Sequence, residues 1–255
     1  MVNSKYEGKV FRTNTSGDLV VTKYINAREV HVKFIDTGYE TVATSGHIKA
    51  GSVKDKLKPK IYGIGVLGDE VTQDLTGVTL KVYALWKNML KRCYYHKHVE
   101  EYPTYKSCTT SENFNYYPYF KSWCNKQIGF NAVDDKGNTF TLDKDILIKG
   151  NKLYSEDTCC FVPEELNLLL VNNASVRGKY PVGVFLDKKV NNFKSKVRCN
   201  GKVREIGTYN TPEEAFLAYK GAKEAYIKEV ANKWKDQIDI RVYEALMKYE
   251  VDIND

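Results

Sequence analysis

The segment "FKSKVRCNGKVREIGTYNTPEEAFLAY", residues 193–219, decides the fold of the C-terminal part of the chain. Two short runs of alternating cationic and apolar residues flank an Asn-Gly pair, which is a strong signal for a β-hairpin. The Thr-Pro-Glu-Glu run from Thr211 to Glu214 has the form of a capping box with proline in the first turn, so a helix is expected to begin there. With "VFLD" at 184–187, the pattern predicts a three-stranded antiparallel sheet followed by a helix.

The two sides of the strand at 193–199 carry different chemistry, because successive side chains of a strand point to opposite faces. One side holds residues that are expected to pack on the helix, namely Phe193, Ser195, Val197 and Cys199. The other side holds cations, and we expect the following strand to add two more across the hairpin. In chain order, this outward row is Lys194, Lys196, Arg198, Lys202 and Arg204.

The local charge surplus favours a polyanionic partner. Nine Lys and Arg lie between Arg177 and Arg204 against one acid, Asp187, in a chain whose formal net charge is +7. A ribbon with such a face fits the major groove of B-DNA, whereas a solvated charged face is the alternative interpretation. We therefore predict contact with double-stranded DNA through Arg177, Lys179, Lys194, Lys196, Arg198, Lys202 and Arg204.

The same region resembles a known family. The order "GVF…FKSKVR…REIGTYNTPEEAFLAYKGAKEAY" is similar to the plant ethylene-response-factor (Apetala-type) DNA-binding domain, which also occurs in phage homing endonucleases. That resemblance implies a sheet in the major groove, with Lys196 and Arg198 at base-contacting positions. Phe193, Glu205 and Phe185 stand where plant members have the tryptophans and an arginine, so the DNA sequence preference of those members does not transfer.

Composition and length place the whole chain among globular proteins. Of its 255 residues, 42% are hydrophobic and 28% charged, and no apolar run approaches the roughly 18 residues that span a bilayer. The N-terminus lacks the apolar core of a signal peptide, so we expect a soluble intracellular protein without a membrane partner. The six cysteines form no CxxC pair and are expected to be reduced and mostly buried, with a zinc site as the minor alternative.

The remaining segments predict an α+β protein of several modules. Short strands are expected over residues 1–58, and their spacing predicts a small, Tudor-like β-barrel or a strongly curved meander. The segment "GHIKAGSVKD" at 46–55 is expected to be extended. A linker leads to a helix at 80–94, a loop, and a second helix that begins at Pro118. Next come a strand, a turn at Lys149–Asn151, an extended piece that ends at Val162, and a short helix. The predicted domains are 1–58, 70–173, 177–235 and a C-terminal helix or tail at 236–255.

A second resemblance concerns the middle of the chain. "LDKDILIKGNKLYSEDTCCFVPEELN" at 142–167, with the lead-in "LWKNMLKRCY" and the aromatic helix around Trp123, resembles phage and prophage HNH-type endonucleases. The segment at 34–55 is similar to the small barrel often fused ahead of such modules. Together the resemblances imply a phage-encoded, HNH-like homing endonuclease in the cytoplasm of a bacterial host, with a central ββα (His-Me finger-like) module.

The resemblance also implies a catalytic set for metal-dependent phosphodiester cleavage. Asp143 would be a ligand of a divalent metal, for which Mg²⁺ is expected, and Asp145 is the alternative ligand. Lys144 occupies the place of the general-base histidine, Thr158 lies near an asparagine position, and Asn167 falls where the last ligand belongs. No small-molecule cofactor is implied.

Three alternatives remain open for this set. Lysine is a poor general base unless it is strongly desolvated, and His96 and His98, in the preceding loop, are the nearest substitutes. The two aspartates also fit the role of turn-capping carboxylates, and Lys144 that of a phosphate contact. The chain would then be a catalytically degenerate DNA-binding protein, such as a repressor or recombination accessory. An interaction protein with no nucleic-acid role is the third possibility.

Overall fold

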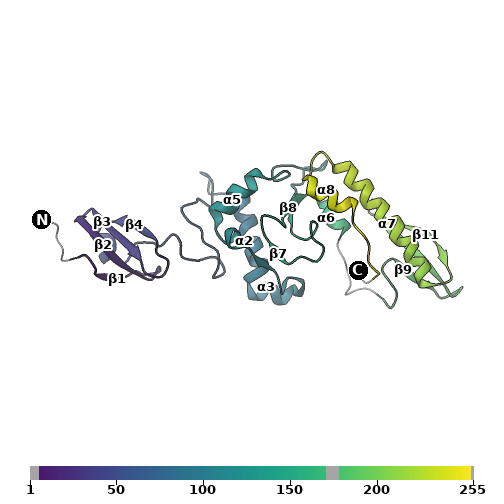
Figure 1. The fold of residues 1–255 in the computed structure, drawn as a ribbon, viewed down its shortest axis with the longest axis horizontal. Coiled ribbons are helices and arrows are strands. Elements are labelled where there is room, and N and C mark those ends of the chain that lie inside the picture. The colour runs from purple at the N-terminus through teal and green to yellow at the C-terminus, as the bar shows by residue number, and fades with distance from the viewer. Residues whose placement is uncertain (1–5, 171–177, 254–255) are drawn as a thin grey trace. The chain divides into compact units, whose positions relative to one another are not determined.

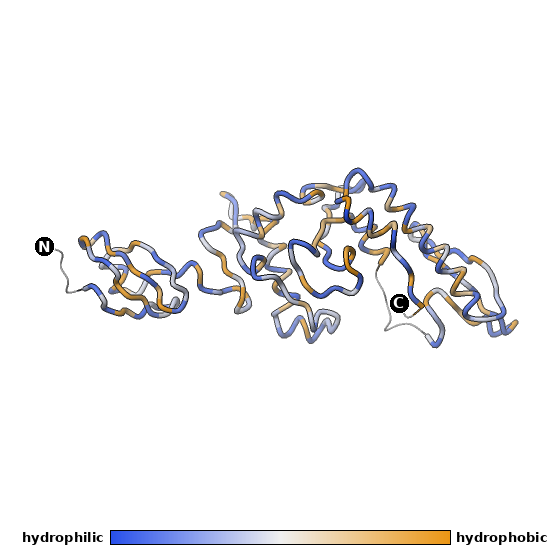
Figure 2. The backbone as a smooth tube through the Cα atoms, viewed as in Figure 1, coloured by the Kyte–Doolittle hydropathy of each residue, from blue (hydrophilic) through white to orange (hydrophobic). Residues whose placement is uncertain are grey.

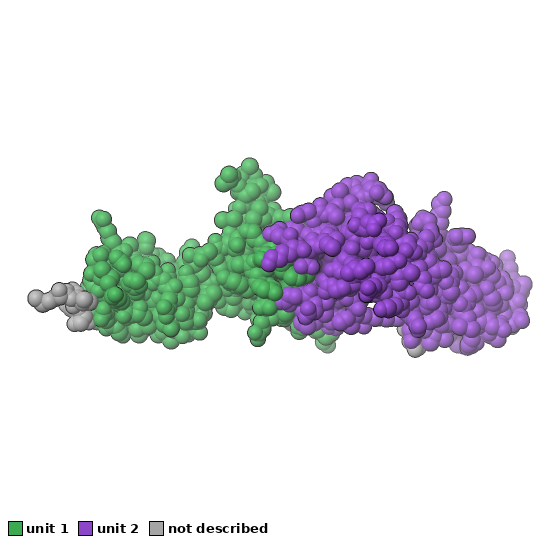
Figure 3. Space-filling model, turned by 45° about the horizontal axis from the view of Figure 1, so that its top comes forward, with its two compact units in different colours: residues 1–123 green, residues 124–255 purple. Residues whose placement is uncertain are grey.

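The computed structural model describes residues 6–170 and 178–253, so the predicted DNA contact Arg177 lies outside the described residues. The fold is of the α+β class, with several small antiparallel sheets and separate helices (Figure 1). The chain divides into two compact units, residues 1–123 and 124–255 (Figure 3). The predicted division into four domains stays a prediction. Within the described ranges, no helix combines the length and the apolar character needed to cross a bilayer.

The first unit begins with a four-stranded antiparallel meander. Its strands follow chain order in the sheet: β1 (Val10–Arg12), β2 (Asp18–Asn26), β3 (Glu29–Phe34) and β4 (Glu40–Ala43). Alternate residues of β2 and β3 form the core, with Leu19, Val32 and Phe34 almost fully buried. Two register shifts interrupt the pairing of β2 with β3, and such irregularities bend a strand. The predicted meander is confirmed, whereas a closed barrel stays a prediction.

The segment after β4 is helical, and the prediction of extended chain from residue 46 is wrong at this point. Helix α1 spans Ser45–Lys49. The hydroxyl oxygen of Thr44 accepts a hydrogen bond from the backbone N–H of His47 at 3.2 Å, which caps the helix. Ile48 is buried in the core of the meander. A local cap and one apolar anchor therefore stabilise a turn of helix that is too short to show periodicity.

The helical part of the first unit confirms two predicted helices. Helix α2 (Lys81–Tyr94) buries residues at three- and four-residue spacing, among them Val82, Trp86 and Leu90. The indole N–H of Trp86 donates to the carbonyl of Phe114 at 2.7 Å, which satisfies a buried donor. The second predicted helix is α5 (Tyr117–Lys126).

The prediction of a loop between these two helices is wrong. The chain there forms α3 (His96–Glu101), the 3-10 helix η1 (Pro103–Tyr105), β5 (Thr109–Thr110) and α4 (Glu112–Asn115). The sequence of α3, HKHVEE, lacks the apolar periodicity that predicts a helix, and none of its residues is buried in the structure.

The second unit opens with the central segment. It contains β6 (Thr141–Asp143), β7 (Leu153–Tyr154), β8 (Cys160–Val162) and α6 (Glu164–Leu169). Strands β6 and β8 pair antiparallel, with Asp143 opposite Cys160. The turn predicted at Lys149–Asn151 is present, since the backbone N–H of Asn151 donates to the carbonyl of Ile148 at 3.0 Å. The prediction that this turn directly joins two paired strands is wrong, because the chain leaves β6 at Asp143 and pairs with it again only at Cys160. The short helix after Pro163 is confirmed.

The C-terminal part has the predicted three-stranded sheet and helix. The elements are β9 (Val184–Asp187), β10 (Asn192–Cys199), β11 (Lys202–Tyr209), α7 (Pro212–Trp234) and α8 (Ile240–Met247). Strand β10 lies in the middle of the sheet, and the capping box at Thr211 is present. Hydrophilic and hydrophobic residues alternate along α7 (Figure 2), which packs Ala215 and Tyr219 against Val184 and Val197 of the sheet. The predicted tail helix corresponds to α8, which is shorter than the tail.

Three side-chain contacts join the central segment to α7. The carboxylate of Glu165 on α6 accepts hydrogen bonds from Lys233 Nζ at 2.7 Å and from the Trp234 indole N–H at 2.8 Å. The ring of Trp234 also meets Phe140 edge-on. The central segment and the C-terminal helix are therefore parts of one packed unit.

Candidate nucleic-acid interface and central carboxylate cluster

The inner face of the C-terminal sheet is as predicted. Val197 is 5% exposed and Ser195 is fully buried, while Phe193 and Cys199 pack partly buried against the same core. The opposite side of β10 therefore faces solvent with Lys194, Lys196 and Arg198, of which Arg198 is exposed.

The register of β11 corrects the predicted row of five cations. Residues directly opposite each other in an antiparallel pair share a face. Arg198 lies opposite Val203 and Lys196 opposite Glu205, whereas Arg204 lies opposite Val197. Lys202 likewise lies opposite Cys199. The prediction that Lys202 and Arg204 continue the outward row is therefore wrong, because a two-residue Asn-Gly loop puts them on the face that packs on α7.

Acidic side chains neutralise one end of the outward face. Lys194 Nζ lies 3.0 Å from an oxygen of Asp187 and 3.8 Å from an oxygen of Glu205. The hydrogen bond with Lys194 lowers the pKa of Asp187, and the same bond raises the pKa of Lys194. Lys194 is therefore held by two carboxylates rather than presented to a partner.

The other end of the face keeps its charge. Lys196 Nζ lies 5.6 Å from the centroid of the exposed Phe185 ring. Arg198 is exposed, and no ion pair of its guanidinium is found in the part of the chain that the structure describes. Lys202 and Arg204 are exposed on the opposite side of the same hairpin. The end of the ribbon thus carries cations on both faces.

The loop at the end of this ribbon is anchored to the helix. Asn200 and Gly201 both have positive φ, 51° and 74°, as a tight hairpin turn requires. The hydroxyl of Tyr226 on α7 accepts the backbone N–H of Asn200 at 2.8 Å and donates to its side-chain oxygen at 3.0 Å. The end of the hairpin is therefore held in place on α7, which preorganises its cations.

The central segment places Asp143 in a buried turn. Its side chain is 8% exposed, and one carboxylate oxygen accepts the backbone N–H groups of Asp145 and Ile146, both at 2.8 Å. Burial raises the pKa of Asp143 to about 6, and the nearby charge of Asp145 acts in the same direction. Asp143 thus has the predicted position at the end of a strand, where it also caps the turn that ends that strand.

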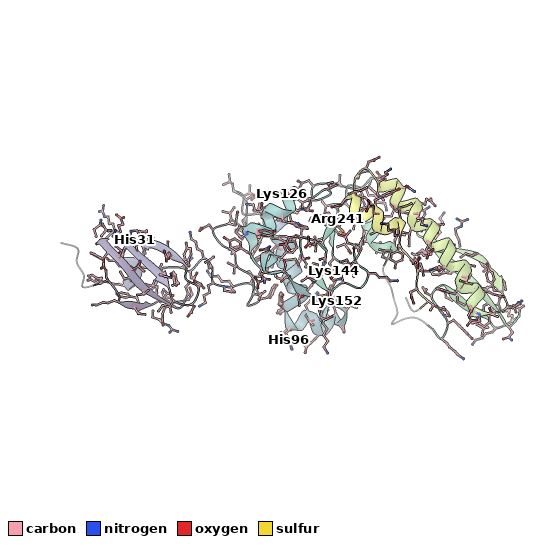
Figure 4. The ribbon with its side chains drawn as sticks, in the orientation of Figure 1. His31, His96, Lys126, Lys144, Lys152 and Arg241 are labelled. Carbon is pink, nitrogen blue, oxygen red and sulfur yellow. The ribbon has the colours of Figure 1, made fainter. Side chains whose placement is uncertain are left out.

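Lys144 is paired with a carboxylate. Lys144, which is labelled in Figure 4, is 8% exposed. Its Nζ lies 3.0 Å from Asp145 Oδ2 and 5.7 Å from the centroid of the Tyr154 ring. An amine that donates to an adjacent carboxylate is placed as a cation, not as a base that accepts a proton from water.

The other members of the expected set have local contacts of their own. The Thr158 hydroxyl donates to the carbonyl of Leu153 at 2.7 Å and accepts the backbone N–H of Ser155, so it closes a local turn. Asn167 lies partly exposed on α6. In the first unit, His96 pairs with Glu100 at 3.5 Å, and the ring of His98 packs on Tyr102. All four histidines precede residue 124, so the unit that contains Asp143 has none.

Two observations bear on the expected divalent metal, which stays a prediction. Among the described residues, no three or more His, Cys, Asp or Glu side chains gather where they could hold one. One oxygen of Asp143 is occupied by backbone donors, and Lys144 already supplies the positive charge beside Asp145. Mg²⁺ instead needs carboxylates whose oxygens are open to it.

The cysteines belong to the core here, as predicted. Cys159 and Cys160 are buried, and burial raises the pKa of both thiols, to about 12 for Cys159. Each of the six cysteines is a thiol rather than half of a disulfide, and four of them are buried. Thiols with raised pKa are poor nucleophiles and poor metal ligands.

Two features of the interface escaped the sequence analysis. Glu205 lies one residue beyond the charge-rich window, and the pairing of Asp187 with Lys194 depends on strand register.

Compared with known proteins, the chain matches no family model, no curated protein and no solved structure.

Proposed function

We propose that this chain binds double-stranded DNA with the β10–β11 ribbon. The observation that carries the proposal is the exposed Arg198 on a hairpin whose opposite face and turn are fixed on α7. A two-stranded ribbon fits the major groove, and an arginine there pairs with a guanine through two hydrogen bonds. Resemblance to the Apetala-type domain points to the same partner.

In this proposal the two faces of the hairpin contact different parts of the duplex. Lys196 and Arg198, on the outward face, contact base edges. Lys202 and Arg204, exposed on the other side, contact phosphates along the groove wall, which adds affinity without sequence information. Lys194 contributes less, because two carboxylates hold its amine.

The primary test is binding of the full chain to a labelled duplex, followed by fluorescence anisotropy. The logarithm of the affinity should fall linearly with the logarithm of salt between about 50 and 200 mM. Failure to bind any duplex at the lowest salt would refute the proposal.

Within this proposal the chain is a DNA-binding protein that does not cleave, of the repressor or recombination-accessory kind. The Lys144–Asp145 pair and the turn around Asp143 support this choice. We also propose that the N-terminal meander is a small Tudor-like barrel and that the central segment is a His-Me finger-like module. The meander and the order β6, β8, α6 support them.

A second candidate is metal-dependent cleavage of the duplex by an HNH-like homing endonuclease. One observation favours it: a buried carboxylate with a pKa of about 6 lies at the end of β6, directly before a β8–α6 unit. A carboxylate in that range is suited to proton transfer near neutral pH.

A plasmid-nicking assay with Mg²⁺ and Mn²⁺ decides between the two candidates. The proposal predicts that the wild type and Asp143→Asn both leave the plasmid supercoiled. Metal-dependent nicking by the wild type that Asp143→Asn abolishes would establish the endonuclease instead. Asparagine keeps the oxygen that accepts the N–H groups of Asp145 and Ile146, so this variant should remain folded.

A further inference from the structure

A row of stacked side chains lies on the surface of the first unit, across α2, α3 and η1. The guanidinium of Arg92 lies 5.7 Å from the centroid of the Tyr105 ring. Tyr105 stacks on His98 at 5.7 Å with 26° between the ring planes, and His98 contacts Tyr102 at 4.7 Å. We call these four residues, Arg92, Tyr105, His98 and Tyr102, the ring ladder.

The ring ladder ends in solvent. Tyr102 is 46% exposed, and α3, from which His98 projects, buries no residue at all. At the other end of α3, Tyr95 is 36% exposed and packs on Tyr62 at 5.4 Å. Exposed aromatic rings that support one another in this way offer flat faces for further stacking.

Cations outnumber acids in the segment that carries the rings. Between residues 80 and 123 the chain has seven Lys and Arg against three Asp and Glu. Lys97 directly precedes His98 and Lys106 directly follows Tyr105 in the chain, and both lysines are exposed. The nearby acids in the sequence are Glu100 and Glu101. Glu100 lies 3.5 Å from the ring of His96, which is labelled in Figure 4. A positively charged surface that presents aromatic faces is complementary to a polyanion with planar groups.

We infer that the ring ladder binds single-stranded DNA, with a base stacked on the outer face of Tyr102. In a duplex the flat faces of the bases are covered by their neighbours, so an exposed ring meets them only where the strands are separated. Lys97 and Lys106 lie on either side of Tyr102 in the chain and contact the flanking phosphates. This site lies in the first unit and does not depend on duplex binding by the C-terminal sheet.

The test compares two probes and three variants of the full chain. The probes are a labelled oligothymidylate and a labelled duplex of mixed sequence, followed by anisotropy. Tyr102→Ala should weaken oligothymidylate binding about tenfold and leave duplex binding unchanged. Tyr102→Phe keeps the ring and should bind like the wild type. Arg198→Ala should show the reverse pattern, with weaker duplex binding only.

Each outcome has one meaning. Oligothymidylate binding that Tyr102→Ala leaves unchanged, or that Tyr102→Phe weakens as much as Tyr102→Ala, would overturn the inference. A poly-glutamate peptide that binds as tightly as the oligothymidylate, with the same Tyr102 dependence, would replace nucleic acid by an acidic peptide. Loss of duplex binding with retained, Tyr102-dependent oligothymidylate binding would refute the proposed function alone. Tyr102 is 46% exposed, and an unchanged thermal melt of the variant excludes misfolding as the cause.

Discussion

Arg198→Ala is the change that most clearly separates a base-contacting arginine from general positive charge. Arg198 is exposed on the outward face, faces Val203 across the hairpin and is bonded to no acid in the described residues. Lys194, four residues earlier on the same face, is held by Asp187 and Glu205. The structure therefore predicts unequal roles for two cations that the sequence pattern treats alike.

The size of the effect follows from the contact. An arginine that pairs with a guanine contributes about 1–3 kcal/mol, so Arg198→Ala should weaken binding to the preferred duplex by about 5- to 150-fold. Arg198→Lys keeps the charge but loses the two-pronged geometry, so it should recover only part of the affinity. Lys194→Ala should have a smaller effect than Arg198→Ala.

The matched control is Lys228→Ala, which removes one positive charge from an exposed position on α7. At about 0.15 M salt the screening length is about 8 Å, so a charge that lies outside the contact surface has little influence on binding. The assay is anisotropy with a duplex selected from a random pool. Equal losses for Arg198→Ala and Lys228→Ala would refute the assignment of Arg198 to the interface.

Three further predictions concern charge, packing and pH. Glu205→Gln removes an acid from the outward face and one of the two carboxylates that hold Lys194, so duplex affinity should rise, by up to about fivefold in the same assay; weaker binding would contradict this. Gly183→Ala should destabilise the protein by about 2–4 kcal/mol in chemical denaturation, because Gly183 has φ +77° and an added Cβ would collide with the Tyr219 ring. Gly201→Ala, with φ +74° but open space around it, is the control and should cost about 1 kcal/mol. Because the folded-state pKa of Asp143 is raised from 3.8 to about 6, its stabilising contribution is complete below about pH 4 and is lost as the pH rises through about 6. The free energy of unfolding should therefore fall by an amount of the order of 2 kcal/mol over that range for the wild type and stay flatter for Asp143→Asn.

Local signals account for the parts of the fold that the sequence predicted well. The capping box at Thr211 and the Asn-Gly turn at 200–201 involve residues only a few positions apart, and both form as expected. The apolar spacing of α2 reflects a buried face that is continuous along one helix. Such features need no knowledge of distant partners.

The errors at the candidate interface arise from strand register and from partners on other strands. A two-residue loop pairs Cys199 with Lys202, and applying that rule to the sequence would have put Lys202 on the inner side. The neutralisation of Lys194 depends on Asp187 from β9 and Glu205 from β11, which meet only in the folded sheet. Counting charges along the chain does not detect such pairing.

The central segment shows the same limit. Its sequence suggests a continuous strand through Asp143. In the structure the carboxylate of Asp143 accepts hydrogen bonds from the backbone N–H groups of Asp145 and Ile146, and this arrangement turns the chain. The partner strand is then β8, whose pairing with β6 spans a long loop. Long-range pairing of this kind carries little local signal.

Photo-crosslinking to a duplex that contains bromodeoxyuridine in place of thymidine, followed by mass spectrometry of the peptides, tests DNA binding by the ribbon most directly. The account predicts crosslinks within β10 and β11, between residues 192 and 209, at salt concentrations where anisotropy detects binding. Crosslinks confined to other parts of the chain, with none in this hairpin, would contradict it.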